Sequence, residues 1–142
     1  VGVALAAVVV LVELASSPHG KVREQTAADS TFPVHPDVEV IAFHGPLFFI
    51  GVENVRRRVR EIADRSILVF DFSDVPVIDE SGALALQDFV GRLRKEDKSV
   101  YIGGLNRKPL RMLIRMGVVD SLGGSRVCKR LESAVNRASQ ER

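Results

Sequence analysis

The sequence predicts an α/β fold with a mostly parallel central sheet, because short buried strands alternate along the chain with amphipathic helices. The apolar runs at 67–72 and 99–102 lack the alternation of a half-exposed strand, which indicates strands buried on both faces. Between them, residues 83–95 place apolar side chains three and four positions apart, as a helix with one buried face requires. Strands joined by such helices are connected by right-handed crossovers into a parallel sheet.

The first 36 residues differ in composition from the rest. Residues 1–12 are all apolar or glycine, a run shorter than the roughly 20 residues of a membrane-spanning helix. We interpret residues 1–15 as the end of a last transmembrane helix, with a buried segment of a soluble protein as the alternative. Residues 16–36 have the polar, Pro- and Gly-containing composition of a linker, which leaves 37–142 as the folded domain. Lys21 and Arg23 follow the apolar run, as expected on its cytoplasmic side.

Two short strands and a helix are expected at the start of the domain. Val38, Val40 and Ala42 alternate as in a strand, a turn follows at 44–46, and the apolar run 47–50 resumes. We therefore expect an N-terminal antiparallel hairpin. Residues 52–64 then carry apolar side chains at helical spacing.

The remaining elements follow in alternation. The helix at 83–95 begins after a turn at Pro76, and Asp79 stands where its cap belongs. After the strand at 99–102, a helix is entered at Pro109 and its unit ends at Gly123 and Gly124. Residues 126–128 are expected to form a short edge strand and 131–138 a closing helix, which makes about four helices around the sheet.

Composition and motifs argue against several functional classes. The 20 Lys and Arg nearly balance the 18 Asp and Glu, and aromatic residues are 6% of the chain, which disfavours a nucleic-acid partner. The single cysteine, Cys128, cannot form an intrachain disulfide, and three scattered histidines do not suggest a metal site. Gly103-Gly104 lacks the remaining residues of a phosphate-binding or dinucleotide motif and is interpreted as a turn. We expect a non-catalytic protein without a cofactor.

The most informative segment joins the central strand to the next helix. The strand ends in an Asp at 71, an apolar-rich turn follows, and residues 79–82 read Asp-Glu-Ser-Gly at the start of the helix. This arrangement resembles the signature of STAS domains, which occur in anti-sigma-factor antagonists and in SulP anion transporters. The resemblance covers about 38–138. The Gly-Pro-Leu-Phe-Phe segment at 45–49 and the apolar run upstream resemble the transporter branch.

The resemblance implies a regulatory loop that binds a partner. The amide groups and positive dipole end of the 83–95 helix favour an anion such as a phosphate. In the soluble antagonists the phosphorylated residue directly follows the first Asp of the motif, but here that position is Glu80, which carries a permanent charge. Helix capping without signalling is the alternative. The expected partner-binding residues are Asp71, Ser73, Asp79, Glu80, Ser81 and Gly82.

A second candidate surface is the basic face of the helix at 52–64. We hypothesise that this face approaches anionic lipid headgroups or the transporter's own cytoplasmic loops. A solvated helix face, with the arginines paired to Glu53 and Glu61, is the alternative. The face is formed by Arg56, Arg57, Arg58 and Arg60.

These observations predict the cytoplasmic regulatory domain of a SulP-type anion transporter of the inner membrane. Its expected partner is the transmembrane domain of the same transporter, with a cytoplasmic protein or a nucleotide at the 79–82 loop, and a homodimer formed through the full-length transporter, as further options. By resemblance the transported anion is sulfate, bicarbonate or a dicarboxylate. The rival interpretations are a soluble anti-sigma-factor antagonist and a domain that holds a nucleotide near the carboxyl ends of the strands.

Overall fold

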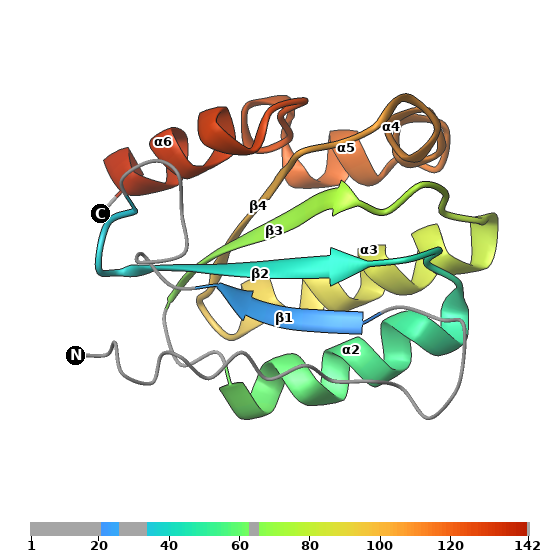
Figure 1. Ribbon diagram of the computed structural model, residues 1–142, viewed down its shortest axis with the longest axis horizontal. Coiled ribbons are helices and arrows are strands. Elements are labelled where there is room, and N and C mark those ends of the chain that lie inside the picture. The colour runs from blue at the N-terminus through green and yellow to red at the C-terminus, as the bar shows by residue number, and fades with distance from the viewer. Residues whose placement is uncertain (1–20, 26–33, 63–65, 142) are drawn as a thin grey trace.

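The sheet has four strands, three of them parallel. The computed structural model describes residues 21–25, 34–62 and 66–141. Figure 1 shows the strands in the order β1-β2-β3-β4, with β1 antiparallel to β2 and the other two parallel to it. The predicted α/β class and the mostly parallel sheet are therefore confirmed. The strands are β1 (Lys21–Gln25), β2 (Val38–His44), β3 (Ile67–Asp74) and β4 (Ser99–Gly103).

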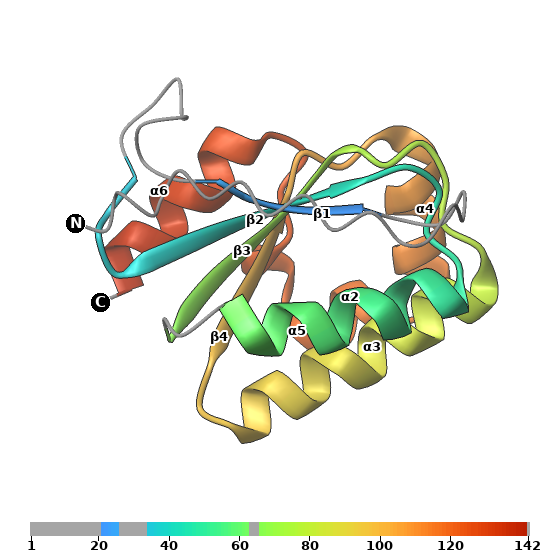
Figure 2. The same ribbon diagram turned by 60° about the horizontal axis from the view of Figure 1, so that its bottom comes forward.

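Helices cover both faces of the sheet in the described part of the chain. Figure 2 shows α2, α3 and α5 below the sheet and α6 above it. A short 3₁₀ helix, η2 (Gly124–Arg126), precedes α6. Within residues 34–62 and 66–141 the α-helices are α2 (Phe49–Ile62), α3 (Glu80–Lys95), α4 (Arg107–Arg115), α5 (Val118–Leu122) and α6 (Leu131–Glu141).

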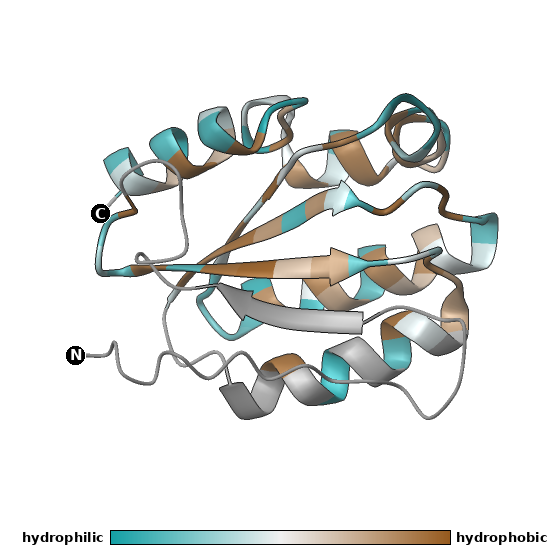
Figure 3. Cartoon of the chain, in the orientation of Figure 1, coloured by the Kyte–Doolittle hydropathy of each residue, from teal (hydrophilic) through white to brown (hydrophobic). Residues whose placement is uncertain are grey.

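The larger core lies between the sheet and α3. Alternate residues of β2 and β3 point to this side, and Figure 3 shows the resulting apolar bands along both strands. Four phenylalanines, each at most 1% exposed, form its centre. The ring of Phe43 lies 5.1 Å from that of Phe70 and 4.8 Å from that of Phe72, and Phe89 of α3 stacks on Phe70 at 5.7 Å. These contacts fix α3 against the two central strands.

A smaller core lies under α6. Small side chains of α6 let the helix approach the sheet closely, and Gly103 at the end of β4 is part of this fit. A Cβ atom at Gly103 would lie 2.7 Å from the Cβ of Ala134 and 3.0 Å from the Cα of Leu131. The residues of the sheet that pack against α6 come from three strands and include Val38, Val40, Ile67, Val69 and Tyr101.

The prediction that residues 47–50 form the second strand of a hairpin is wrong. Leu47 forms only an isolated parallel bridge with Ile78, and Phe49 already begins α2. The apolar run at 47–50 misled the prediction because it combines a fully buried residue, Leu47, with the half-exposed first residue of a helix. The antiparallel partner of β2 is instead β1, which lies inside the segment 16–36 that was expected to be a linker.

Two further elements differ from the prediction. The helix entered at Pro109 divides into α4 and α5, because Gly117 adopts a φ of 78° between them. The expected edge strand at 126–128 is wrong: Arg126 ends η2, and only Val127 forms an isolated bridge, to Ile102 of β4. The 3₁₀ turn leaves too little extended chain for a strand.

A polar cluster holds the end of α6 to β4. Glu141 accepts hydrogen bonds from the hydroxyl groups of Ser99 and Tyr101. The guanidinium of Arg126 lies 4.8 Å from the centre of the Tyr101 ring and 3.5 Å from the Glu141 carboxylate. Burial, followed by the hydrogen bond to Glu141, raises the pKa of Tyr101 to about 12.

Tyr101 is the single tyrosine of the chain, so its ionisation can be followed by the ultraviolet absorbance of tyrosinate. We expect the Tyr101 hydroxyl to ionise near pH 12 in the folded chain and near pH 10 in denaturant. Because the folded state holds the phenolic proton more tightly, the stabilisation from this group is complete below pH 10 and is lost between pH 10 and 12. The variant Glu141→Gln should lower the folded pKa, and wild-type ionisation near pH 10 would contradict the cluster.

Candidate functional site

The predicted loop lies at the edge of the sheet where β2, β3 and β4 all end. His44 pairs with Asp74 across β2 and β3, and Asp71 with Gly103 across β3 and β4. This edge, the carboxyl edge of the sheet, is where open α/β folds place their ligands. Of the six predicted residues, a first group lies at the end of β3 and a second group at the start of α3. The first group is Asp71 and Ser73, and the second is Asp79, Glu80, Ser81 and Gly82.

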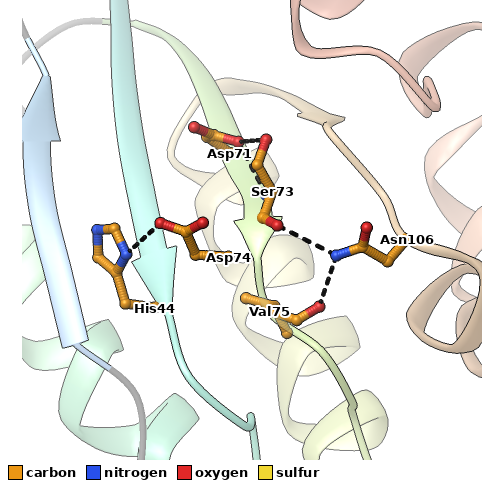
Figure 4. A network of polar contacts seen from close by, with 6 residues as sticks. All are labelled: His44, Asp71, Ser73, Asp74, Val75 and Asn106. Carbon is orange, nitrogen blue, oxygen red and sulfur yellow. Dashed lines mark hydrogen bonds and ion pairs between the residues drawn. The ribbon is translucent and has the colours of Figure 1, made fainter.

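Asp71 and Ser73 are hydrogen-bonded to each other near the end of β3 (Figure 4). Asp71 is 8% exposed, and its Oδ1 accepts hydrogen bonds from the backbone N–H of Ser73 at 2.9 Å and from the Ser73 hydroxyl at 2.6 Å. Gly104, with a φ of 74°, packs against this pair, since a Cβ atom there would lie 2.8 Å from the same oxygen and would overlap the Ser73 hydroxyl. The buried carboxylate is therefore satisfied within the chain.

Two residues missed by the sequence analysis complete this group. The Asn106 side chain donates hydrogen bonds to the carbonyl groups of Ser73 and Val75, both at 3.1 Å. The His44 Nδ1 lies 2.8 Å from the Asp74 carboxylate. Asn106 could have been found from the sequence, because it stands just before a predicted helix. The contact of His44 with Asp74 depends on the pairing of two strands and leaves no local pattern in the sequence.

Asp79 caps α3, as the sequence predicts. Its Oδ1 accepts hydrogen bonds from the backbone N–H of Gly82 at 2.6 Å and from the Ser81 hydroxyl at 2.9 Å. The backbone of Leu47 lies alongside: its N–H donates to the Val77 carbonyl at 3.0 Å, and its carbonyl accepts from the Asp79 N–H at 3.4 Å. The first turn of α3 is therefore fixed by both its own cap and the chain that enters α2.

Glu80 points away from this cap. Its carboxylate lies 2.7 Å from the guanidinium of Arg115 in α4, and both side chains are nearly two-thirds exposed. An ion pair this exposed contributes about 1 kcal/mol at most. The pair joins the first residue of α3 to the last residue of α4.

The structure brings the predicted loop residues to one edge but in two separate groups. Among the described residues, no hydrogen bond or ion pair joins Asp71 and Ser73 to the cluster at 79–82. Figure 4 shows the first group turned toward the loop that follows β4.

The arginines of α2 do not all share one environment. Arg56 lies about one helical turn from the buried residues Val52 and Val59 and donates to Glu53 at 2.6 Å, while its Nε is buried without a hydrogen-bond partner. Arg57 is exposed. The side chains of Arg58 and Arg60 lie outside the described residues, so a membrane-facing role for these four residues stays a hypothesis.

No metal site is found in the described part of the chain, where no three His, Cys, Asp or Glu side chains are placed to hold an ion. Within the same residues, no helix is both long enough and apolar enough to cross a membrane. Residues 1–15, expected to be the end of a transmembrane helix, lie outside the described residues.

Comparison with known proteins identifies the family. Residues 30–134 match the model of the STAS domain, and the chain belongs to this family. The bicarbonate transporter BicA of Synechocystis sp. is 30% identical over 74 residues, which are 52% of this chain. The chain spans only 13% of the length of that transporter.

Two solved structures are similar over nearly the whole domain. The STAS domain of a SulP transporter from Vibrio cholerae is 29% identical with a TM-score of 0.66, and the match covers 79% of this chain and 87% of that one. An anti-sigma factor antagonist from Mycobacterium paratuberculosis has a TM-score of 0.67 at 15% identity, with 88% of this chain and 98% of that one covered. The second likeness shows the fold alone.

Replacing Asp79 by alanine tests the cap. We expect Asp79→Ala to lower the free energy of unfolding by about 1 kcal/mol, because the Gly82 N–H loses its acceptor, whereas Asp79→Asn should lose little. Glu80→Gln serves as the control and should change stability by a few tenths of a kcal/mol, as expected for an exposed ion pair. Urea denaturation measures all three. If Asp79→Ala were as stable as the wild type, the cap would not stabilise α3.

Proposed function

We propose that this chain is the cytoplasmic, non-catalytic regulatory domain of a SulP-type secondary anion transporter. The observation that carries the proposal is the similarity to the Vibrio cholerae SulP domain at 29% identity, because it extends over most of both chains. The similarity to BicA, which is named as a bicarbonate transporter, supports the same class. The domain would lie at the cytoplasmic face of the inner membrane, with the transmembrane domain of the same transporter as its partner.

The polar groups at the carboxyl edge support binding rather than catalysis. The hydroxyl groups of Ser73 and Ser81 donate to Asp71 and Asp79, so neither is activated by a histidine base. His44 contacts Asp74 instead. Side chains held in this way present a fixed polar surface to a partner.

Glu80 would give this surface a constant negative charge. It occupies the position that is phosphorylated in the soluble antagonists this sequence resembles, and it cannot itself be switched by a kinase. The site would therefore bind a basic or polar segment constitutively. The transporter's own cytoplasmic loops are the nearest candidate. A cytoplasmic protein or a nucleotide would bind at the same 79–82 loop, whereas a homodimer would form through the full-length transporter.

A soluble anti-sigma-factor antagonist is the second candidate. The shared fold, with a TM-score of 0.67 to one such protein, favours it. The acidic residue at position 80 disfavours it, since partner release by phosphorylation at that position would be lost.

Anion uptake by the full-length protein in proteoliposomes tests the proposal. We would compare labelled sulfate and labelled bicarbonate uptake by the wild type, a truncation after Gly20 and Glu80→Ser, all at equal membrane abundance. We expect the truncation and Glu80→Ser to change uptake about fivefold or more, the lower end of typical allosteric coupling. The matched control is Asp88→Ser, which removes another exposed acid of α3 that is paired with an arginine. Unchanged uptake in both test variants would overturn a regulatory role.

A further inference from the structure

The exposed surface of α4 is rich in basic side chains. Arg107, Lys108 and Arg111 are exposed, and in the part of the chain that the structure describes none of the three has an ion-pair partner. Arg115, one turn beyond Arg111, pairs with Glu80. The first turn of α4 contains no acidic residue, so two cations stand at the end of the helix where its dipole disfavours positive charge. Helix stability therefore does not explain this arrangement.

Three helices that border the carboxyl edge, α2, α3 and α4, each carry one exposed large apolar side chain. The exposed large hydrophobic residues of the described chain are Phe49, Leu84 and Ile114, at 50%, 52% and 56%. Phe49 is the first residue of α2, and Leu84 lies in the second turn of α3. Ile114 precedes Arg115, which reaches the first residue of α3. Cationic side chains beside exposed apolar ones are typical of surfaces that lie on an anionic bilayer.

The chain also enters the domain at this edge. Lys21, the first residue of β1, pairs with His44 at the carboxyl end of β2. The start of α4 lies at the same edge, because Asn106 just before it is bonded to the end of β3 (Figures 1 and 4). If residues 1–15 end a transmembrane helix, only residues 16–20 separate that helix from Lys21. Such a segment spans at most about 20 Å.

We propose that the basic face of α4, formed by Arg107, Lys108 and Arg111 with Ile114 beside them, docks on anionic lipid headgroups of the membrane that holds the transporter. These residues follow one another at helical spacing and so lie on one side of α4. The guanidinium and ammonium groups would donate hydrogen bonds to lipid phosphates. A lipid surface is the occupant because the short tether, which rests on the proposed function, keeps this edge beside the bilayer.

Vesicle flotation of the complete 142-residue chain tests this docking. One set of vesicles contains phosphatidylcholine alone, and the other also contains anionic phosphatidylglycerol. The test variant is Arg107→Gln/Lys108→Gln/Arg111→Gln. The control, Arg92→Gln/Arg94→Gln/Lys95→Gln, removes the same charge from the last turn of α3, at the opposite edge of the sheet. Every protein keeps residues 1–12, so the readout is the ratio of binding to anionic and to neutral vesicles.

We expect the test variant to lose most of the preference for anionic vesicles. Each basic residue close to an anionic surface strengthens binding about fivefold, so removing three should lower the ratio on the order of a hundredfold. The wild-type preference should also weaken in high salt. The control triple should stay within about threefold of the wild type, because its charges lie away from the membrane.

Two results would overturn the docking: an unchanged ratio in the test variant, or an equal loss in both triples, which would reflect net charge alone. Circular dichroism confirms that each variant is folded. Failure of the docking can be told apart from failure of the proposed function. Flotation measures lipid binding without transport, whereas the uptake experiment measures transport by variants in a single lipid composition.

Discussion

The main chain of Leu47 lies against the first turn of α3, and the geometry of the candidate site depends on this contact. Leu47 exchanges hydrogen bonds with the backbone of Val77 and Asp79 on either side of Ile78. A Cβ atom on Gly82 would overlap the Leu47 carbonyl, so the helix can begin this close only with glycine at that position. The glycine of the Asp-x-Ser-Gly motif is thus explained by packing, and its backbone N–H is also the donor to the Asp79 cap.

Together with two other contacts, this contact connects the three loops of the carboxyl edge. The chain leaving β2 is held to the start of α3 through Leu47, and the chain leaving β4 is held to the end of β3 through Asn106. The pair Glu80–Arg115 then joins α3 to α4. The loop proposed to regulate transport and the helix proposed to touch lipid are therefore in direct contact, which gives a physical route by which a change at one would be felt at the other.

Long periodic segments were predictable, and contacts between distant segments were not. The bounds of β3, β4 and α6 follow closely from apolar runs and helical spacing, and Asp79 was identified as a cap from its place before a helix. β1 carries no apolar alternation, and its strand form depends on pairing with β2. Gly104, Asn106 and His44 act through tertiary contacts that leave no local pattern. The sequence analysis did not single out the basic residues of α4, and only the fold shows that, among the described residues, Arg107, Lys108 and Arg111 have no ion-pair partner.

Matched glycine substitutions in α3 test the central constraint most directly. Gly82→Ala should lower the free energy of unfolding by about 1 to 3 kcal/mol, because the new methyl group meets the rigid backbone of Leu47. Gly91→Ala lies in the same helix, where an added Cβ meets no described atom within 4 Å, and should raise stability by about 0.5 to 1 kcal/mol. Urea denaturation of both variants measures the difference. Equal stability of the two variants would contradict the account, since the start of α3 would then not depend on its contact with Leu47.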